Sequence, residues 1–202
     1  MSERLQTDSH LRGCVKGTVL LSRLELIRSE RGQGGVERVC ARLPPEERAL
    51  VAGPIMPMAW YPFETNDRID LAIVSELGGQ DSIFLTLGAR SAEDNLGASH
   101  RSYVRSKDPQ GLLKQAAQIY RLYYNTGYRT YEWVASNKAI LRTYDAKAYS
   151  RHDSLTVVGW HEKAIELCGG RRQRVTEPRC RVRGDEHCEY VCEWQAPQSS
   201  GG

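Results

Sequence analysis

The sequence Cys180-Arg-Val-Arg-Gly-Asp-Glu-His-Cys188, followed by an alternating run that ends at Trp194, decides the fold we expect for the C-terminal part of the chain. Gly184 and Asp185 are typical of a tight reversal between two strands. Because the two cysteines lie about equally far from that reversal, they should face each other on one side of the sheet, with Cβ atoms roughly 4.5 to 5.5 Å apart. A thiophilic metal can bridge two thiols at that separation, and a disulfide can join them after some adjustment.

Upstream of this hairpin, the spacing of apolar residues separates a sheet-forming part of the chain from a helical part. A period of two predicts strands at 128–134 and 139–144, and a helical period predicts a helix at 153–167. With hairpin strands at 174–182 and 187–194, the order is β-β-α-β-β. Earlier in the chain the pattern predicts helices at 17–31, 36–43, 64–77, 81–96 and 110–124, with another opening at Pro44 and Pro45.

The expected fold class is α+β, with a helical N-terminal half packed on an antiparallel sheet. We expect a single domain over residues 14–195, made of a helical part at 14–125 and a sheet-containing part at 126–195. Residues 1–13 and 196–202 should form a flexible N-terminus and a flexible tail.

The composition excludes several classes of protein. No run approaches the roughly 18 consecutive apolar residues of a membrane span, and the N-terminus lacks an apolar signal segment, so we expect a cytoplasmic protein. Basic and acidic residues are interspersed and no nucleic-acid-binding motif accompanies them, which argues against nucleic acid as a partner. No nucleophile elbow, phosphate loop or metal-hydrolase signature occurs, which predicts that the protein is not an enzyme.

Short motifs over nearly the whole chain resemble those of a large paralogous family of myxobacterial proteins. They are Lys16-Gly-Thr-Val-Leu-Leu-Ser-Arg-Leu24, Trp60-Tyr-Pro-Phe63, Ser91-Ala-Glu-Asp-Asn95, Tyr124-Asn-Thr-Gly127 and Gly159-Trp160, together with the cysteine hairpin. The C-terminal half is more distantly similar to the vinyl-4-reductase-type small-molecule-binding domain, which is related to haem-nitric-oxide-binding domains. The positions that fit that domain's motif are Gly159, Glu177, Cys180, Gly184, Asp185, Cys188 and Tyr190.

This resemblance implies a zinc site. In phenol-sensing relatives the domain holds zinc with three cysteines and one glutamate, and Cys180 and Cys188 take two of those places, with Glu132 as the candidate glutamate. The third cysteine is expected at about Ser154, whose hydroxyl is a poor zinc ligand. Three interpretations of the cysteine pair stay open: a zinc site, two packed thiols, and a disulfide, which a reducing compartment disfavours.

The histidines show no metal-binding spacing. His161 should lie on an exposed helix face, and His161 and His100 are the candidates for a haem ligand of the kind found in the haem-nitric-oxide relatives. Because neither sits in a recognisable ligation motif, the sequence disfavours haem as a cofactor.

Aromatic residues are the remaining candidates for a binding site. The relatives keep a cavity between helix and sheet, and Tyr120, Tyr124, Tyr131, Trp133 and Trp160 would line it here. We therefore expect a non-catalytic sensor domain that binds a small apolar or aromatic ligand and signals through a protein partner or as a homodimer. The alternative is a ligand-free scaffold subunit, in which the same aromatic residues simply fill the core.

Overall fold

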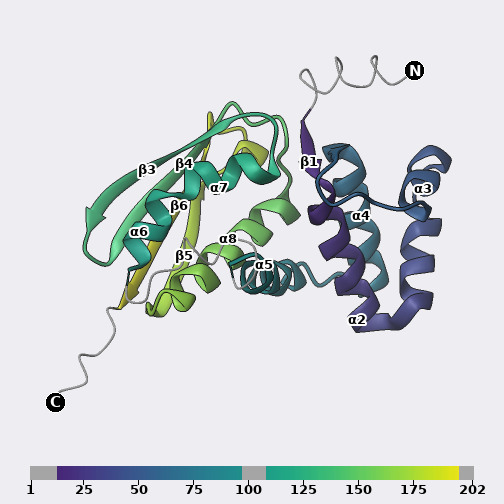
Figure 1. The fold of residues 1–202 in the computed structure, drawn as a ribbon, viewed down its shortest axis with the longest axis horizontal. Coiled ribbons are helices and arrows are strands. Elements are labelled where there is room, and N and C mark those ends of the chain that lie inside the picture. The colour runs from purple at the N-terminus through teal and green to yellow at the C-terminus, as the bar shows by residue number, and fades with distance from the viewer. Residues whose placement is uncertain (1–12, 97–107, 196–202) are drawn as a thin grey trace.

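The structure is a computed structural model that describes residues 13–96 and 108–195. Its elements, in chain order, are β1 (Cys14–Lys16), α2 (Gly17–Ala41), α3 (Pro45–Ala52), β2 (Trp60–Pro62), α4 (Phe63–Glu76), α5 (Ile83–Asp94), α6 (Pro109–Lys114), α7 (Ala116–Tyr123), β3 (Tyr128–Ala135), β4 (Lys138–Tyr144), α8 (Arg151–Leu167), β5 (Arg171–Arg179), the 3₁₀ turn η3 (Arg181–Arg183) and β6 (Cys188–Gln195). In Figure 1, helices α2, α3 and α4 gather at one end, the larger sheet lies at the other, and α5 and α8 lie between them.

The helical end is built on α2 and α4, which pack through fully buried aliphatic side chains such as Leu20, Ile27 and Ile69. Helix α2 bends at Gly32, whose φ of 67° is a left-handed conformation that glycine adopts without steric cost. The two helices predicted at 17–31 and 36–43 are therefore the two arms of one kinked element. A short antiparallel pair, β1 and β2, joins the start of α2 to the start of α4 and was not predicted from the sequence.

The larger sheet is antiparallel, with the strand order β3-β4-β6-β5. Side chains in β4 and β6 alternate between buried and half-buried along most of each strand, so one face of the sheet packs against helices and the other faces outward. Inward-pointing Leu141, Tyr190 and Cys192 belong to the core of this half. The β-β-α-β-β order and the α+β class predicted from the sequence are confirmed.

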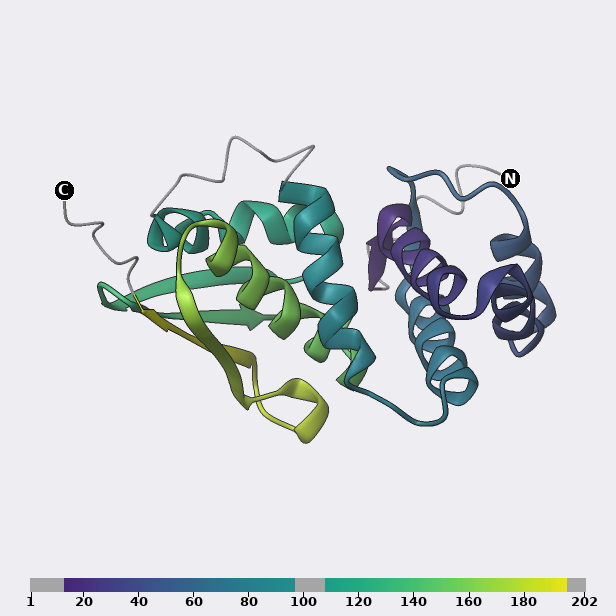
Figure 2. The same ribbon diagram turned by 90° about the horizontal axis from the view of Figure 1, so that it is seen from below.

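Helices α5 and α8 cross at very close range in the middle of the molecule, as Figure 2 shows from below. A Cβ atom built on Gly88 would lie 2.0 Å from the carbonyl oxygen of Thr156, and one built on Gly159 would lie 2.1 Å from that of Leu85. The lack of a side chain at Gly159 therefore permits the close approach of α5. The close contact joins the first half of α5 to the middle of α8, and the cavity described below is lined by residues of both helices, including Ser91 and Trp160.

The helix predicted at 110–124 is broken at Gln115 into α6 and α7. The predicted flexible ends, 1–13 and 196–202, lie almost entirely outside the described residues. Within the described ranges, no helix is both long enough and apolar enough to span a bilayer.

Candidate functional site

A cavity of about 420 Å³ lies between the helical end and the sheet. Five elements line it: α2, the end of α5, α7, β3 and α8, with Pro57 from the connector before β2. The exposed side chains of Glu25 and Arg28 lie on its solvent side, and the buried side chains of Arg23 and His161 lie deeper. This volume is within the range of small-molecule sites, roughly 300 to 1,000 Å³.

Arg23 is a fully compensated cation in the cavity wall. Its Nε donates to Asp70 Oδ1 at 2.8 Å and its Nη2 to Asp70 Oδ2 at 3.2 Å, while Asp153 Oδ1 lies 3.6 Å from Nη2. The Tyr124 hydroxyl donates to the same Asp153 oxygen at 2.8 Å. Burial raises the pKa of Asp70 to about 7, against the opposing effect of the Arg23 charge. These residues come from α2, α4, α7's end and α8, so the cluster ties the two halves of the molecule together.

Arg129 is a second cation in the same cavity, and its surroundings differ. Its Nε donates to Thr143 Oγ1 at 2.9 Å, and its Nη1 lies 3.4 Å from His161 Nε2. The guanidinium carbon lies over the Tyr120 ring at 4.9 Å and the Tyr190 ring at 5.5 Å. No carboxylate among the described residues lies within ion-pair distance of Arg129.

His161 is fully buried, and the expectation that it lies on an exposed face was wrong. Burial, together with the nearby charge of Arg129, lowers its pKa well below the usual value, so the imidazole is neutral at pH 7. Its Nδ1 has no hydrogen-bond partner. The sequence misled because His161 belongs to the buried face of α8, which faces Tyr190 of β6 at a ring distance of 5.5 Å. His100 lies outside the described residues.

Three of the five predicted aromatic residues line the cavity: Tyr120, Tyr124 and Trp160. Tyr120 and Tyr124 stack with ring centroids 4.8 Å apart. The prediction that Tyr131 and Trp133 line the cavity was wrong. Tyr131 points to α6, where its hydroxyl donates to Gln110 Oε1 at 2.7 Å, and Trp133 is 61% exposed on the edge strand β3. A register shift in the pairing of β3 with β4 between Trp133 and Ala135 ends the regular alternation there.

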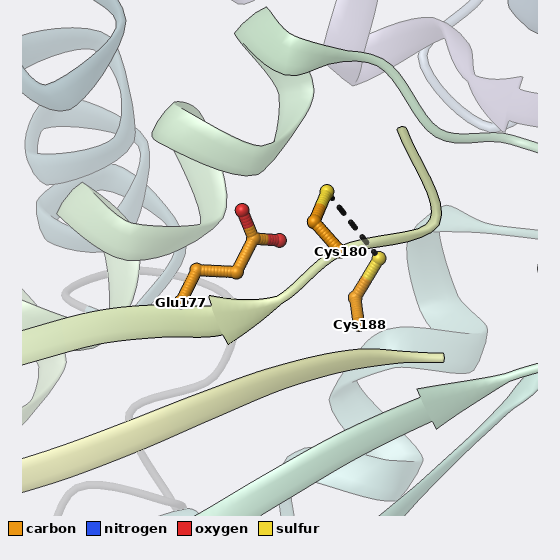
Figure 3. A group of neighbouring side chains, drawn as sticks. All are labelled: Glu177, Cys180 and Cys188. Atoms are coloured by element: carbon orange, nitrogen blue, oxygen red, sulfur yellow. Dashed lines mark hydrogen bonds between the residues drawn. The ribbon is translucent and has the colours of Figure 1, made fainter. Parts of the chain in front are cut away.

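The cysteine pair forms a second cluster, at the tip of the β5–β6 hairpin. The two Sγ atoms, of Cys180 and Cys188, lie 4.0 Å apart, and both side chains are buried (Figure 3). The loop between them is fixed by Asp185, whose carboxylate accepts from the Cys180 amide at 2.7 Å, and by Gly184 at a φ of 90°. The predicted juxtaposition of the thiols is therefore present, although Cys180 follows β5 instead of belonging to it.

A carboxylate completes this cluster, and it comes from Glu177. One donor atom each from Glu177, Cys180 and Cys188 lie within 4.8 Å of one another, and Figure 3 shows the carboxylate pointing toward Cys180. Glu177 Oε1 is buried without a hydrogen-bond partner. The choice of Glu132 was wrong, because that side chain is on the outer face of the sheet, paired with Arg142 at 2.6 Å.

Ser154 lies where the resemblance expects a third cysteine. Its Oγ is 3.5 Å from Cys180 Sγ, so a residue of α8 does reach the cluster, but with a hydroxyl. His152, two residues earlier, instead contacts Phe84 and Asp81 and does not reach the thiols. Burial raises the pKa of Cys188 to about 12, partly offset by the Arg181 amide that donates to its Sγ, so without a metal the thiol stays protonated.

The fold is shared with solved structures of H-NOX proteins. An Fe(II) unliganded H-NOX protein from K. algicida is 12% identical, with a TM-score of 0.71 over 92% of this chain and 100% of that chain. An H-NOX protein from S. oneidensis in the Fe(II)NO state is 15% identical, with a TM-score of 0.68 over 89% and 99%. A third structure, from work probing heme distortion in the H-NOX family, is 14% identical, with a TM-score of 0.66 over 93% and 98%. No protein-family model and no curated protein matches the sequence.

The expectation that disfavoured haem was wrong, because the structures that share this fold come from a family studied for its heme. That expectation relied on the absence of a spaced histidine motif. Haem iron held by a single proximal histidine requires no second residue at a fixed spacing, so its ligand carries no such signal in one sequence.

Proposed function

We propose that this protein is a non-catalytic sensor module that binds haem in the cavity between its helical half and its sheet. The observation that carries the proposal is the cavity itself, which is about 420 Å³ in volume and is lined by both halves. Ligand binding there would change contacts on α2 and α8 together. The H-NOX proteins of the same fold support haem as the ligand to test first.

The residues present fit such a group. The rings of Tyr120, Tyr123 and Trp160 supply flat apolar walls, and His161 supplies a buried neutral imidazole to the lining. A neutral imidazole is the form that ligates iron. When bound, haem supplies an iron centre that accepts a histidine nitrogen and a small ligand. The protein residues position the group and exclude water. A ligand that shifts Arg23 or Tyr124 would change contacts in both halves, because these side chains bond to Asp70 and Asp153.

A haem titration tests this proposal. Purified protein should bind haem with a stoichiometry of about one and give the absorbance spectrum of a histidine-ligated haem. His161→Ala and His100→Ala identify the ligand, because the variant that lacks it should lose that spectrum. His187→Ala is the matched control, since His187 is buried but is not part of the cavity lining. Failure of wild-type protein to bind haem, or any member of a panel of small aromatic compounds, would favour the scaffold function.

A sensor without a catalytic or DNA-binding motif must signal through contact with another protein. We propose a homodimer or a stable heteromeric partner. Sedimentation at micromolar concentrations should show a species heavier than the 22.8 kDa chain, or a second protein should co-purify with it. A lone monomer under both conditions contradicts this part of the proposal.

We also propose that Glu177, Cys180 and Cys188 hold a thiophilic divalent metal ion. Two thiols and one carboxylate within 4.8 Å of one another form a donor set that zinc accepts. A metal ion would also give a partner to Glu177 Oε1, which is buried and makes no hydrogen bond. Protein purified without chelator should contain about one equivalent of metal by elemental analysis, and Cys188→Ser should remove it. Cys192→Ser is the control, because Cys192 is equally buried but outside the cluster. Less than about 0.1 equivalent in the wild type contradicts the proposal.

A further inference from the structure

We propose that Arg129 binds a carboxylate or similar anionic group, so that the ligand of the cavity is a flat apolar molecule with an acidic end. This inference rests on the proposed function, because it concerns the same cavity, and it specifies the chemistry of the ligand and the residue that selects it.

The cations of the cavity wall differ in their counter-ions. Arg28 is neutralised at the solvent side by Glu25, whose carboxylate lies 2.6 Å away. Arg23 is neutralised by Asp70 and Asp153. Arg129 is the cation of the described lining that has no carboxylate within ion-pair distance, since the remaining lining carboxylate, Asp94, is exposed at the end of α5 and forms no ion pair with it.

Arg129 cannot lose its charge by deprotonation. The guanidinium stays protonated at any physiological pH. The Arg129 side chain is half-buried in the cavity wall, so its charge is only partly solvated and a bound anion would complete its surroundings. The charge of Arg129 opposes the rise in pKa that burial causes in Asp153, so the two groups are near each other. The Asp153 carboxylate, however, already contacts Arg23 and Tyr124. His161 is neutral and adds no negative charge.

The orientation of the Arg129 guanidinium also suits an anionic ligand. The bond from Nε to Thr143 fixes the plane of the guanidinium, and the Tyr120 and Tyr190 rings contact it. Of the five N–H donors of an arginine, those on Nη2 have no protein acceptor among the described residues. A fixed guanidinium with free donors that faces a cavity is suited to bind a planar carboxylate with two parallel hydrogen bonds.

The rest of the lining limits the body of the ligand. The same cavity is lined by side chains that offer apolar surface and flat rings: Ile119, Tyr120, Tyr123, Val157 and Trp160. A small inorganic anion would leave these side chains without contact, and flat rings match the Tyr120, Tyr123 and Trp160 rings best. The matching class is therefore a fused or linked ring system that carries an acidic group at one end.

A matched pair of probes tests the inference without haem. The dissociation constants of 1-pyrenebutyrate and 1-pyrenebutanamide, which share their shape but differ in charge, are measured by fluorescence on the full-length protein. The wild type should bind the acid at least about tenfold more tightly than the amide, since one hydrogen-bonded charge pair contributes at least that factor. In Arg129→Gln the two affinities should come within about twofold, with the affinity for the amide unchanged. Arg38→Gln, which removes an exposed, paired cation outside the cavity lining, should keep the wild-type ratio.

Equal affinities in the wild type, or a ratio that survives in Arg129→Gln, would overturn the inference. Unchanged affinity of Arg129→Gln for the amide shows that the variant has folded. If neither probe binds while haem does, the inference fails and the proposed function stands. If the acid binds through Arg129 while haem does not bind, the anionic subsite stands and the proposed haem function fails.

Discussion

Arg23 and Arg129 line the same cavity, yet one arginine is saturated with carboxylates and the other has none. Arg23 joins α2 to α4 and α8 through Asp70 and Asp153, with its side chain almost completely removed from solvent. Arg129 is held by a hydroxyl, a neutral imidazole and two aromatic rings. The difference indicates separate roles: Arg23 holds the two halves of the protein together, and Arg129 supplies an unmet charge to a ligand.

The largest effect should follow removal of Arg23. Arg23→Met leaves Asp70 and Asp153 buried beside each other without a cation, which should lower the free energy of unfolding by roughly 3 to 5 kcal/mol. Urea denaturation followed by circular dichroism measures this change. A loss below about 1 kcal/mol would mean that the cluster does not hold the halves together.

A smaller effect should appear in the pH dependence of stability. The pKa of Asp70 is raised to about 7 in the folded protein, so the folded state binds more protons than the unfolded state from about pH 4 to about pH 7. This group therefore contributes a loss of stability as the pH rises through that window, by at most about 1.4 kcal/mol per pH unit. Above pH 7 its contribution should be constant.

Asp70→Asn isolates this contribution, because it retains the shape of the side chain and removes the titration. The difference in unfolding free energy between wild type and variant should slope with pH below pH 7. His161, whose lowered pKa acts in the opposite direction, cancels in this difference. A difference that does not vary with pH would show that Asp70 is ionised throughout.

The smallest effect on stability should come from Arg129. Arg129→Met removes a cation that has no counter-ion and leaves no buried carboxylate behind, so the free energy of unfolding should change by less than about 1 kcal/mol. Thermal denaturation of the ligand-free variant measures it. A loss as large as that of Arg23→Met would show that the two arginines have the same structural role.

The sequence predicted best what depends on neighbours along the chain. The Cys180 and Cys188 pairing followed from a short hairpin, and the β-β-α-β-β order followed from changes in apolar period. The choice of Glu132 failed because the place of Glu177 depends on an irregularity in strand pairing. On a regular strand, Glu177 and Cys180, which are three residues apart, would face opposite sides of the sheet. In the structure the pairing of β5 with β6 shifts register between Thr176 and Arg179, Cys180 follows the end of β5, and the Glu177 carboxylate lies beside both thiols.

The cavity was predictable only in part. Tyr120 and Tyr124 share a helical face, which the sequence reveals. The contacts that give the site its charge join residues far apart, such as Arg23 with Asp70 and Arg129 with His161, and no local pattern marks them. The burial of His161 could not be predicted from the sequence. A polar residue can lie on the buried face of a helix where a distant side chain such as Arg129 contacts it, and that contact is not visible in the local pattern.

Competition between haem and 1-pyrenebutyrate tests most directly whether this cavity is the ligand site of the protein. Wild-type protein saturated with the pyrene probe is titrated with haem, and the pyrene fluorescence anisotropy is recorded. The account predicts that one equivalent of haem displaces the probe completely, because both occupy the cavity lined by Trp160 and Arg129. Haem that binds without displacing the probe, or that does not bind, would contradict it.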